Sequence, residues 1–400
     1  MKKKVELLAP AGDLERLKIA LEYGADAVYI GGPLLNLRAN AINFTIDELK
    51  EGILYAHSFG KKVYVTVNII LHNKELEKVD EYLRKLSEIN VDAIIISDPI
   101  IISIAKKYGI EVHLSTQQST LNYEAVAFWK KEGVSRIVLG RECSKEDIEI
   151  IMNNVDIEIE TFIHGAMCAG YSGRCVMSNV LTNRDANRGG CSQICRWDFN
   201  LLNSSMKKIE GDKPFTFCSK DLSMLECIPE MIDMGITSFK IEGRMRSSYY
   251  IATVVSVYRK IIDNYYNNII DFEYNRYERI LRNCANRDST VQFYNGSYDS
   301  SCSYYNGRCE VSNQDFLGII LEYDKKTHMA TIEQRNFFQK GERVEIFGPN
   351  HIYDYIIGDI YDVNGDIIQV VRHPKQVVYL QIDVDVDNNY MIRKKSKDNT

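Results

Sequence analysis

Four cysteines gather in one short stretch of this sequence. Cys168, Cys175, Cys191 and Cys195 follow the pattern C-x6-C-x15-C-x3-C within the segment 164–197. The residues between them are rich in Gly, Asn, Ser and Arg and have no apolar period, so the segment cannot fold around a core of its own. Four thiolates that bind one metal centre would hold such a segment together. We therefore expect a cysteine-ligated metal centre here.

The spacing favours an iron–sulfur cluster over a zinc ion. Structural zinc sites use closely paired ligands, whereas only Cys191 and Cys195 form a close pair here. Iron–sulfur clusters accept four thiolates at irregular spacing. Free buried cysteines and two disulfides are the alternatives without a metal. Cys218 and Cys227 are the reserve ligands if one of the four is not used.

The composition is that of an ordinary globular protein. Of 400 residues, 45% are hydrophobic and 26% are charged, and the net charge is −6. This charge argues against a nucleic-acid coat protein but permits a local basic surface. The N-terminus is a poor signal peptide, and no apolar run is long enough to span a membrane. We expect a cytoplasmic protein, in which clustered cysteines bind metals or act in catalysis more often than they form disulfides.

Short apolar runs alternate with amphipathic stretches through the first 265 residues. Strands are expected at 5–9, 27–30, 62–68, 93–97, 111–115, 136–139, 157–163 and 238–241, with helical patterns between and after them. Eight such units in about 260 residues predict an α/β fold, a (β/α)8 TIM-like barrel with a cysteine-rich insertion after strand seven. A doubly wound sheet is the main alternative, although neither G-x-G-x-x-G nor a P-loop is present.

Two regions are expected beyond the barrel. The barrel domain spans 1–285, and its insertion spans 164–222. Residues 286–312 are rich in Tyr, Asn and Ser and read as a linker or irregular loop. Short strands at 316–323, 329–334, 343–347, 355–361, 367–371 and 377–382 predict a small C-terminal all-β barrel domain over 313–395. The basic tail from residue 392 is expected to fray.

The carboxyl ends of barrel strands form the active site of such folds, and the residues there are the candidates. The candidate ligand-binding residues are Arg38, Asn40, Asn68, Ser115, Gln117, Arg141, Lys240 and Arg244. The candidate acids and bases are Asp98, Glu160, His164 and Glu242. For any single one of the carboxylates, a structural salt bridge is the favoured interpretation. This set predicts a pocket for an anion beside the cysteine segment, which leaves strand seven at the same mouth.

Other catalytic patterns are weaker. A nucleophilic pair of Cys168 with His164 would rest on closeness in sequence alone, which says little about closeness in space. No H-E-x-x-H is present, and Gly170–Gly173 is one residue short of a G-x-S-x-G elbow.

At ETFIHGAMCAGYSGRCVMS, residues 160–178, the sequence resembles the signature of the collagenase-like peptidase family of unclassified catalytic type. The resemblance covers most of the chain, including ELLAPAGDLERLKIALEYGADAVYIGG, SKDLSMLECIPEMIDMGITSFKIEGRMRS and MATIEQRNFFQKGERVEIFGP. Within this family the chain is most similar to the branch of prephenate-dependent tRNA uridine 5-hydroxylation proteins.

The resemblance implies a specific activity. It implies an enzyme that installs 5-hydroxyuridine at the tRNA wobble position, with prephenate as a co-substrate or ligand and a 4Fe–4S cluster on the four cysteines. Related branches hydroxylate a ribosomal RNA cytidine or a ubiquinone precursor, and some act as pairs of paralogues, so a paralogue is a candidate partner. Arg38, Arg141 and Arg244 suit a dicarboxylate such as prephenate. Arg184 and Arg188 are candidates to hold the tRNA anticodon stem.

The sequence also departs from the family. Ser223 stands where some relatives have a cysteine, and Thr290-Val291-Gln292-Phe293 stands where T-G-F is usual. Two rival functions stay open. One is a peptidase acting on collagen-like substrates, and the other is a binding or assembly protein that carries a cluster as a structural staple.

Overall fold

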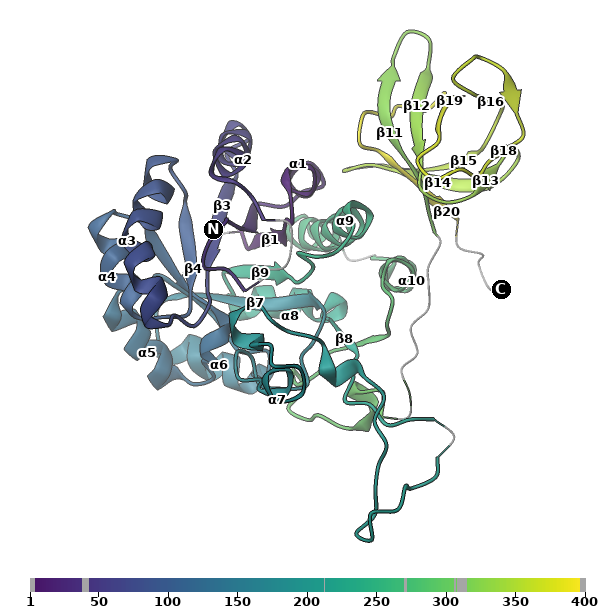
Figure 1. The fold of residues 1–400 in the computed structure, drawn as a ribbon. Helices are drawn as coiled ribbons and strands as arrows, with labels where there is room; N and C mark the ends of the chain where they lie inside the picture. Colours follow the sequence, from purple (N-terminus) through teal and green to yellow (C-terminus); the bar gives the residue numbers. More distant parts are fainter. Residues whose placement is uncertain are drawn as a thin grey trace. The chain divides into compact units, whose positions relative to one another are not determined.

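Eight parallel strands close into a barrel that is surrounded by helices (Figure 1). The computed structural model describes residues 4–37, 43–211, 213–269, 272–305, 307 and 315–395. The barrel strands are β1 (Glu6–Pro10), β2 (Ala27–Gly31), β3 (Lys62–Val67), β4 (Ala93–Ile96), β5 (Glu111–Leu114), β6 (Arg136–Val138), β7 (Glu158–Gly165) and β9 (Ser238–Ile241). Because β9 pairs in parallel with both β7 and β1, the sheet has no open edge there. The predicted (β/α)8 barrel is confirmed, and the doubly wound alternative is wrong.

A helix follows each barrel strand along the chain. The helices are α1 (Leu14–Glu22), α2 (Ile46–Ser58), α3 (Asn73–Glu88), α4 (Ile100–Lys107), α5 (Tyr123–Glu132), α6 (Lys145–Asn154), α8 (Ile228–Met234) and α9 (Ser248–Tyr266). Local signals set their ends: Thr45 and Glu48 form a capping box at the start of α2, and Gly133 takes a left-handed conformation after α5. In the described part of the chain, no helix has the length and apolar character that a membrane crossing needs.

Charged side chains are buried where the barrel closes. The carboxylate of Glu160 on β7 accepts from Lys240 Nζ of β9 at 2.6 Å and from Arg136 Nη1 of β6 at 3.2 Å. Arg136 also pairs with Glu6 of β1 and with Glu158. Burial alone would raise the pKa of Glu160, but the two cations outweigh it and lower the pKa. The carboxylate therefore stays ionised and links β6, β7 and β9, and Arg136 extends the network to β1.

The insertion after β7 adds short elements of its own. It contains α7 (Met177–Thr182) and ends in β8 (Asp221–Ser223), which pairs antiparallel with β7. Strand β10 (Ser289–Thr290) pairs with β8, so part of the expected linker 286–312 belongs to the barrel unit. After β8 the chain passes through a short 3-10 turn, Leu225–Cys227, before α8 begins at Ile228. Strands of two or three residues have no readable period, which is why the sequence missed β8 and β10.

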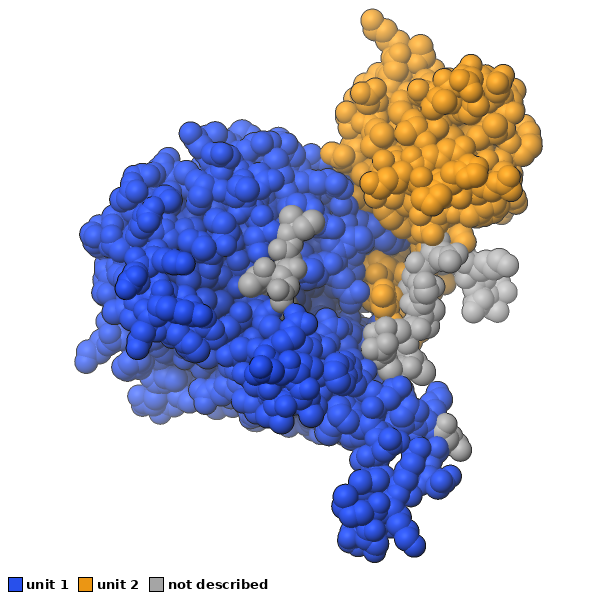
Figure 2. All heavy atoms as spheres, viewed as in Figure 1, with its two compact units in different colours: residues 1–274, 287–310 blue, residues 275–286, 311–400 orange. Residues whose placement is uncertain are grey.

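The chain divides into two compact units (Figure 2). Unit 1 comprises residues 1–274 and 287–310 and holds the barrel, and unit 2 comprises residues 275–286 and 311–400. Unit 2 holds most of α10 (Tyr274–Cys284) and ten strands, which confirms the predicted C-terminal all-β region. The strands are β11 (Phe316–Asp324), β12 (Met329–Gln334), β13 (Phe338–Gln339), β14 (Arg343–Phe347), β15 (Ile352–Ile356), β16 (Ile360–Tyr361), β17 (Ile367–Ile368), β18 (Val370–Val371), β19 (Val377–Gln381) and β20 (Met391–Lys394).

The last strand corrects one prediction. Residues 392–394 of the tail expected to fray belong instead to β20, which pairs antiparallel with both β11 and β14, and residues 396–400 lie outside the described residues. Arg393 is buried within it, and its Nε donates to a Glu345 carboxylate oxygen at 2.7 Å. A basic residue is tolerated inside the sheet because this carboxylate offsets its charge. The high density of basic residues was therefore a poor indicator that these residues lie outside regular structure.

The buried carboxylate of Glu160 provides a test of barrel closure. Glu160→Ala leaves Lys240 buried without its partner and removes one partner of Arg136. Loss of one member of a buried ion pair costs about 3–5 kcal/mol, so we expect the free energy of unfolding in urea to fall by that amount. Asp80→Ala removes an exposed pair with Lys107 and should leave the urea midpoint in place. Equal midpoints in the two variants would contradict the structural role of Glu160.

Candidate functional site

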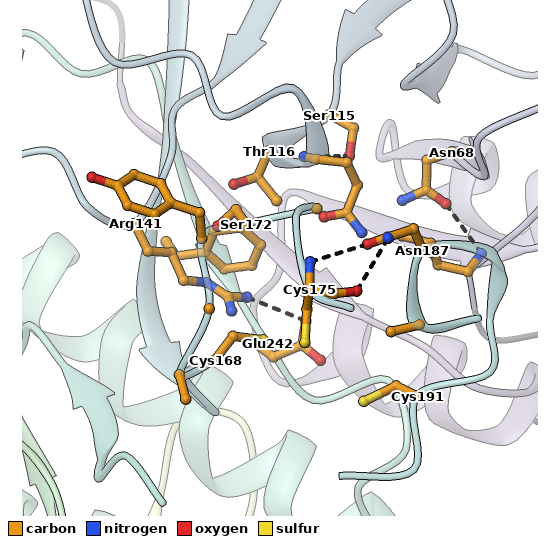
Figure 3. Close-up of a pocket in the computed structure, with 18 of the residues that line it drawn as sticks. Asn68, Ser115, Thr116, Arg141, Cys168, Ser172, Cys175, Asn187, Cys191 and Glu242 are labelled. Atoms are coloured by element: carbon orange, nitrogen blue, oxygen red, sulfur yellow. Dashed lines mark hydrogen bonds and ion pairs between the residues drawn. The ribbon is translucent and has the colours of Figure 1, made fainter. Parts of the chain in front are cut away.

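One pocket at the carboxyl ends of the barrel strands brings most predicted site residues together (Figure 3). Its wall includes residues of the cysteine segment, and its other lining comes from the ends of the strands. The predicted residues that line it are Asn68, Ser115, Gln117, Arg141, Lys240, Glu242, Arg244, Cys168, Cys175, Cys191 and Cys195. The anion-binding candidates and the candidate metal ligands therefore share one cavity.

Three predicted acids or bases do not line this pocket. Asp98 lies at the start of α4, where its carboxylate accepts from the amide of Ile100 at 3.2 Å. Glu160 is fully buried and serves as the counter-ion of Lys240. His164 is discussed below. Arg38 and Asn40 lie outside the described residues.

His164 points away from the pocket because β7 is irregular. Strict alternation would put His164 on the same face as Glu160 and Phe162. The register with β9 shifts between Phe162 and His164, which reverses the direction of the imidazole. Its Nδ1 lies 3.2 Å from the hydroxyl oxygen of Tyr258 on α9, and burial lowers the pKa of His164 to about 3. The position gives no support to a catalytic role or to a pair with Cys168.

Three cations and one carboxylate occupy the described lining of the pocket. Arg141 stacks on the ring of Phe162, with its Cζ 3.8 Å from the centroid, and donates to the carbonyl of Ala166 at 3.0 Å. Its Nη2 lies 3.7 Å from a carboxylate oxygen of Glu242. Figure 3 labels both residues among those that line the pocket. The Lys240 ammonium lies 4.6 Å from the ring centroid of Tyr29. This excess of positive charge favours an anionic ligand.

Arg244 is held in a fixed orientation by neutral groups. The side chain is 5% exposed, and its guanidinium donates to Thr66 Oγ1 at 3.3 Å and to Asn36 Oδ1 at 3.0 Å, as well as to Asn43. A Cβ at Gly31 would overlap the guanidinium, so only glycine permits this approach. A guanidinium positioned before the ligand arrives is suited to recognise a carboxylate.

Polar contacts fasten the cysteine segment to the barrel. Arg188 donates to both carboxylate oxygens of Glu75 on α3, at 2.9 and 3.0 Å, and to the carbonyl of Ile70 at 2.7 Å. Within the segment, the Asn187 side chain hydrogen-bonds both the N–H and the carbonyl of Cys175 (Figure 3). Arg188 therefore holds the segment in place, whereas Arg184, the other loop arginine predicted to contact an anticodon stem, is exposed.

The four thiols suit a cysteine-ligated cluster in their chemistry. All four side chains line the pocket, and none of the nine described cysteines forms a disulfide. Burial, followed by the nearby Cys168 and Cys191 thiols, raises the pKa of Cys195 to about 11. Four thiols around one cavity are the usual donor set of an iron–sulfur cluster. Among the described residues, no three His, Cys, Asp or Glu side chains already converge as ligands of a single ion. The reserve ligands Cys218 and Cys227 do not line the pocket.

Sequence reasoning missed several lining residues. Tyr29, Thr66 and Phe162 lie inside strands, where an apolar pattern indicates core, and nothing in the sequence marks the end of the barrel at which they lie. Tyr171 and Ser172 lie between two predicted ligands, and that position was the available signal.

Comparisons with known proteins place this site in a family. The profile of "Peptidase family U32" matches residues 12–313, and that of the "Peptidase family U32 C-terminal domain" matches residues 312–393. The "tRNA hydroxylation protein P1" of Bacillus subtilis is 48% identical, over 98% of this chain and 95% of its own.

Two further relatives carry other names. The "23S rRNA 5-hydroxycytidine C2501 synthase" of Escherichia coli is 39% identical over 65% of this chain and 39% of its own length. The "Collagenase" of Porphyromonas gingivalis is 31% identical, over 86% of each chain.

The Arg188–Glu75 pair predicts how the cysteine segment responds to mutation and to acid. The hydrogen bond from Arg188 lowers the pKa of Glu75 to about 2, so the pair is fully formed above the ordinary glutamate pKa and is lost as pH falls towards 2. We expect limited proteolysis at pH 7 to cleave Arg188→Ala faster than the wild type within residues 164–222. The wild-type protein should become equally susceptible in this segment only at acidic pH. Exposed Arg184→Ala is the matched control. Equal cleavage of both variants would show that the pair does not hold the segment.

Proposed function

The chain belongs to peptidase family U32, as its sequence predicts, and we propose that it takes part in the hydroxylation of tRNA. In full, the proposal is an enzyme that installs 5-hydroxyuridine at the wobble position, with prephenate and a 4Fe–4S cluster. The observation that carries it is the pocket in which four thiols meet three cations. The near full-length relative named for tRNA hydroxylation supports the choice of substrate class. A tRNA substrate is consistent with the expected cytoplasmic location, and a paralogue partner remains a prediction.

Seven side chains of the pocket have a role in this proposal. Hydroxylation replaces a C–H bond of the base by C–OH, so the reaction requires a co-reactant that donates the oxygen atom and an acceptor for the two electrons that the base loses. A cluster bound by Cys168, Cys175, Cys191 and Cys195 would supply electron transfer next to the pocket. Arg141 and Arg244 would bind the two carboxylates of prephenate, because the guanidinium fork matches carboxylate geometry. Glu242 is the one predicted acid or base in the described lining, and we assign it the proton transfer.

The target base has to leave the anticodon loop to reach this pocket. Loop bases can be splayed out of an RNA, whereas bases inside a helix are covered by their neighbours. The pocket includes the rings of Tyr29 and Phe162, which offer apolar faces to a base. The site is thus suited to a nucleotide together with an anion.

The peptidase reading receives less support from the site. The family name and the relative named collagenase favour it. A cysteine peptidase needs an imidazole beside its thiol, and the described residues that line the pocket include no histidine. His164 contacts Tyr258 instead.

The proposal is tested first by metal content and then by activity. We expect wild-type protein purified without oxygen to hold about four irons and to absorb like a cubane cluster. Cys191→Ala should lose the iron, because one of four ligands is missing. Mass spectrometry of tRNA nucleosides should then show 5-hydroxyuridine formed by the wild type and not by the variant. Zinc in the wild-type protein would contradict the assignment of an iron–sulfur cluster. Hydroxylated cytidine in ribosomal RNA would show that the substrate is ribosomal RNA and not tRNA.

Arg244 tests the anion-binding part of the proposal. Arg244→Lys keeps the positive charge but loses the planar fork that Gly31 and Thr66 hold in position. We expect prephenate to bind about tenfold more weakly in isothermal titration calorimetry, which corresponds to about 1.4 kcal/mol. Arg184→Lys, on an exposed side chain, is the matched control and should bind like the wild type. Unchanged affinity of Arg244→Lys for prephenate would show that Arg244 does not contact this ligand.

A further inference from the structure

A tight turn between two of the cysteines presents two side chains at the mouth of the pocket. The turn runs from Tyr171 to Arg174 and is closed by a hydrogen bond from the Arg174 amide to the Tyr171 carbonyl at 3.0 Å. Tyr171 lines the pocket and yet is 55% exposed. Arg174 is also exposed. These two residues form what we call the rim pair.

The two inner residues of the turn are anchored to the barrel. Ser172 is buried, its amide donates to a Glu142 carboxylate oxygen at 3.1 Å, and its carbonyl accepts from the hydroxyl of Ser119. Gly173 has φ +73°, and a Cβ there would overlap the backbone of Gln117. Because Ser172 and Gly173 are fixed inward, Tyr171 and Arg174 are held outward in a defined orientation.

Neither side chain of the rim pair makes a ring contact or an ion pair with another described residue. A single exposed ring is ordinary on a protein surface, but this ring is held on an anchored turn at the mouth of the pocket. An aromatic face beside a guanidinium fits an unpaired nucleobase and its phosphate, since every base has a face that stacks and every phosphate attracts a cation.

We propose that the rim pair binds the nucleotide next to the target base, with Tyr171 stacking on the base and Arg174 contacting a phosphate. This inference rests on the proposed function and names a contact for its RNA substrate. A base that enters the pocket loses stacking on its neighbour in the strand, and the Tyr171 ring replaces that contact. The rim pair therefore distinguishes a single-stranded loop from a duplex.

The test compares two RNAs and two matched variants by fluorescence polarisation. One RNA is an anticodon stem–loop, and the other is a duplex with the same stem and no loop. Tyr171→Leu removes the ring and should weaken binding of the stem–loop about tenfold while leaving the duplex unchanged. Tyr171→Phe keeps the ring and should bind both RNAs like the wild type. Arg174→Gln should lower the slope of log affinity against log salt by about 0.7 for the stem–loop.

The outcomes separate this inference from the proposed function. Wild-type protein that fails to bind the stem–loop would count against the proposed function itself. Wild-type binding that Tyr171→Leu leaves unchanged, or weakens equally for both RNAs, would overturn the rim pair alone. Loss of affinity for a Gly-Pro-rich peptide in Tyr171→Leu, with RNA binding intact, would assign the ring to a peptide and also overturn it. Iron content and thermal midpoint report on folding, and Tyr171→Trp should restore stem–loop binding if Tyr171→Leu is less stable.

Discussion

The carboxylate of Glu160, shared by Lys240 and Arg136, is the interaction on which the site depends. These residues lie on β7, β9 and β6, and Arg136 extends the network to Glu6 on β1, across the seam where the barrel closes. Leaving Lys240 buried without this partner would be costly. Glu160 pairs with Lys240 beside the pocket, and the same carboxylate links the strands whose ends carry Arg141, Glu242 and Arg244. One buried carboxylate therefore contributes both to closure of the barrel and to the position of a pocket cation.

The sequence predicted the barrel because each strand is a short apolar run between helices with clear start signals. The capping box at Thr45 and the positive φ at Gly133 are local features that the residue types at these positions predict. Strands β8 and β10 escaped because they exist only through pairing with distant segments. Strand β20 escaped for another reason, since the basic residue Arg393 is neutralised by Glu345, far away in the sequence. The spacing of apolar residues shows which side of a strand or helix is buried. It carries no information about partners that lie far away in the sequence.

The residues of the candidate site also differ in how far local sequence could predict them. Residues directly after strands, such as Asn68, Arg141 and Arg244, could be predicted because the fold places every strand end at one mouth. The direction of a side chain could not be predicted where the strand is irregular. His164 follows the alternation of Glu160 and Phe162 in sequence, and one extra residue in β7 turns it to Tyr258. A bulge is set by packing of neighbouring strands, so no local pattern announces it.

The cysteine segment gains its structure from the barrel and gives the barrel its pocket wall. It has no apolar core of its own in sequence, and two polar contacts attach it to the barrel: the Ser172 amide donates to Glu142, and the Arg188 side chain pairs with Glu75. The four cysteines lie before, between and after these two anchors in the chain, and all line the same cavity as the cations. Any group that draws the four thiols together must move the wall of the pocket as well, because the same short stretch carries both. A group bound at the thiols would therefore change the affinity of the pocket for its ligand, and the reverse effect would be equal in size.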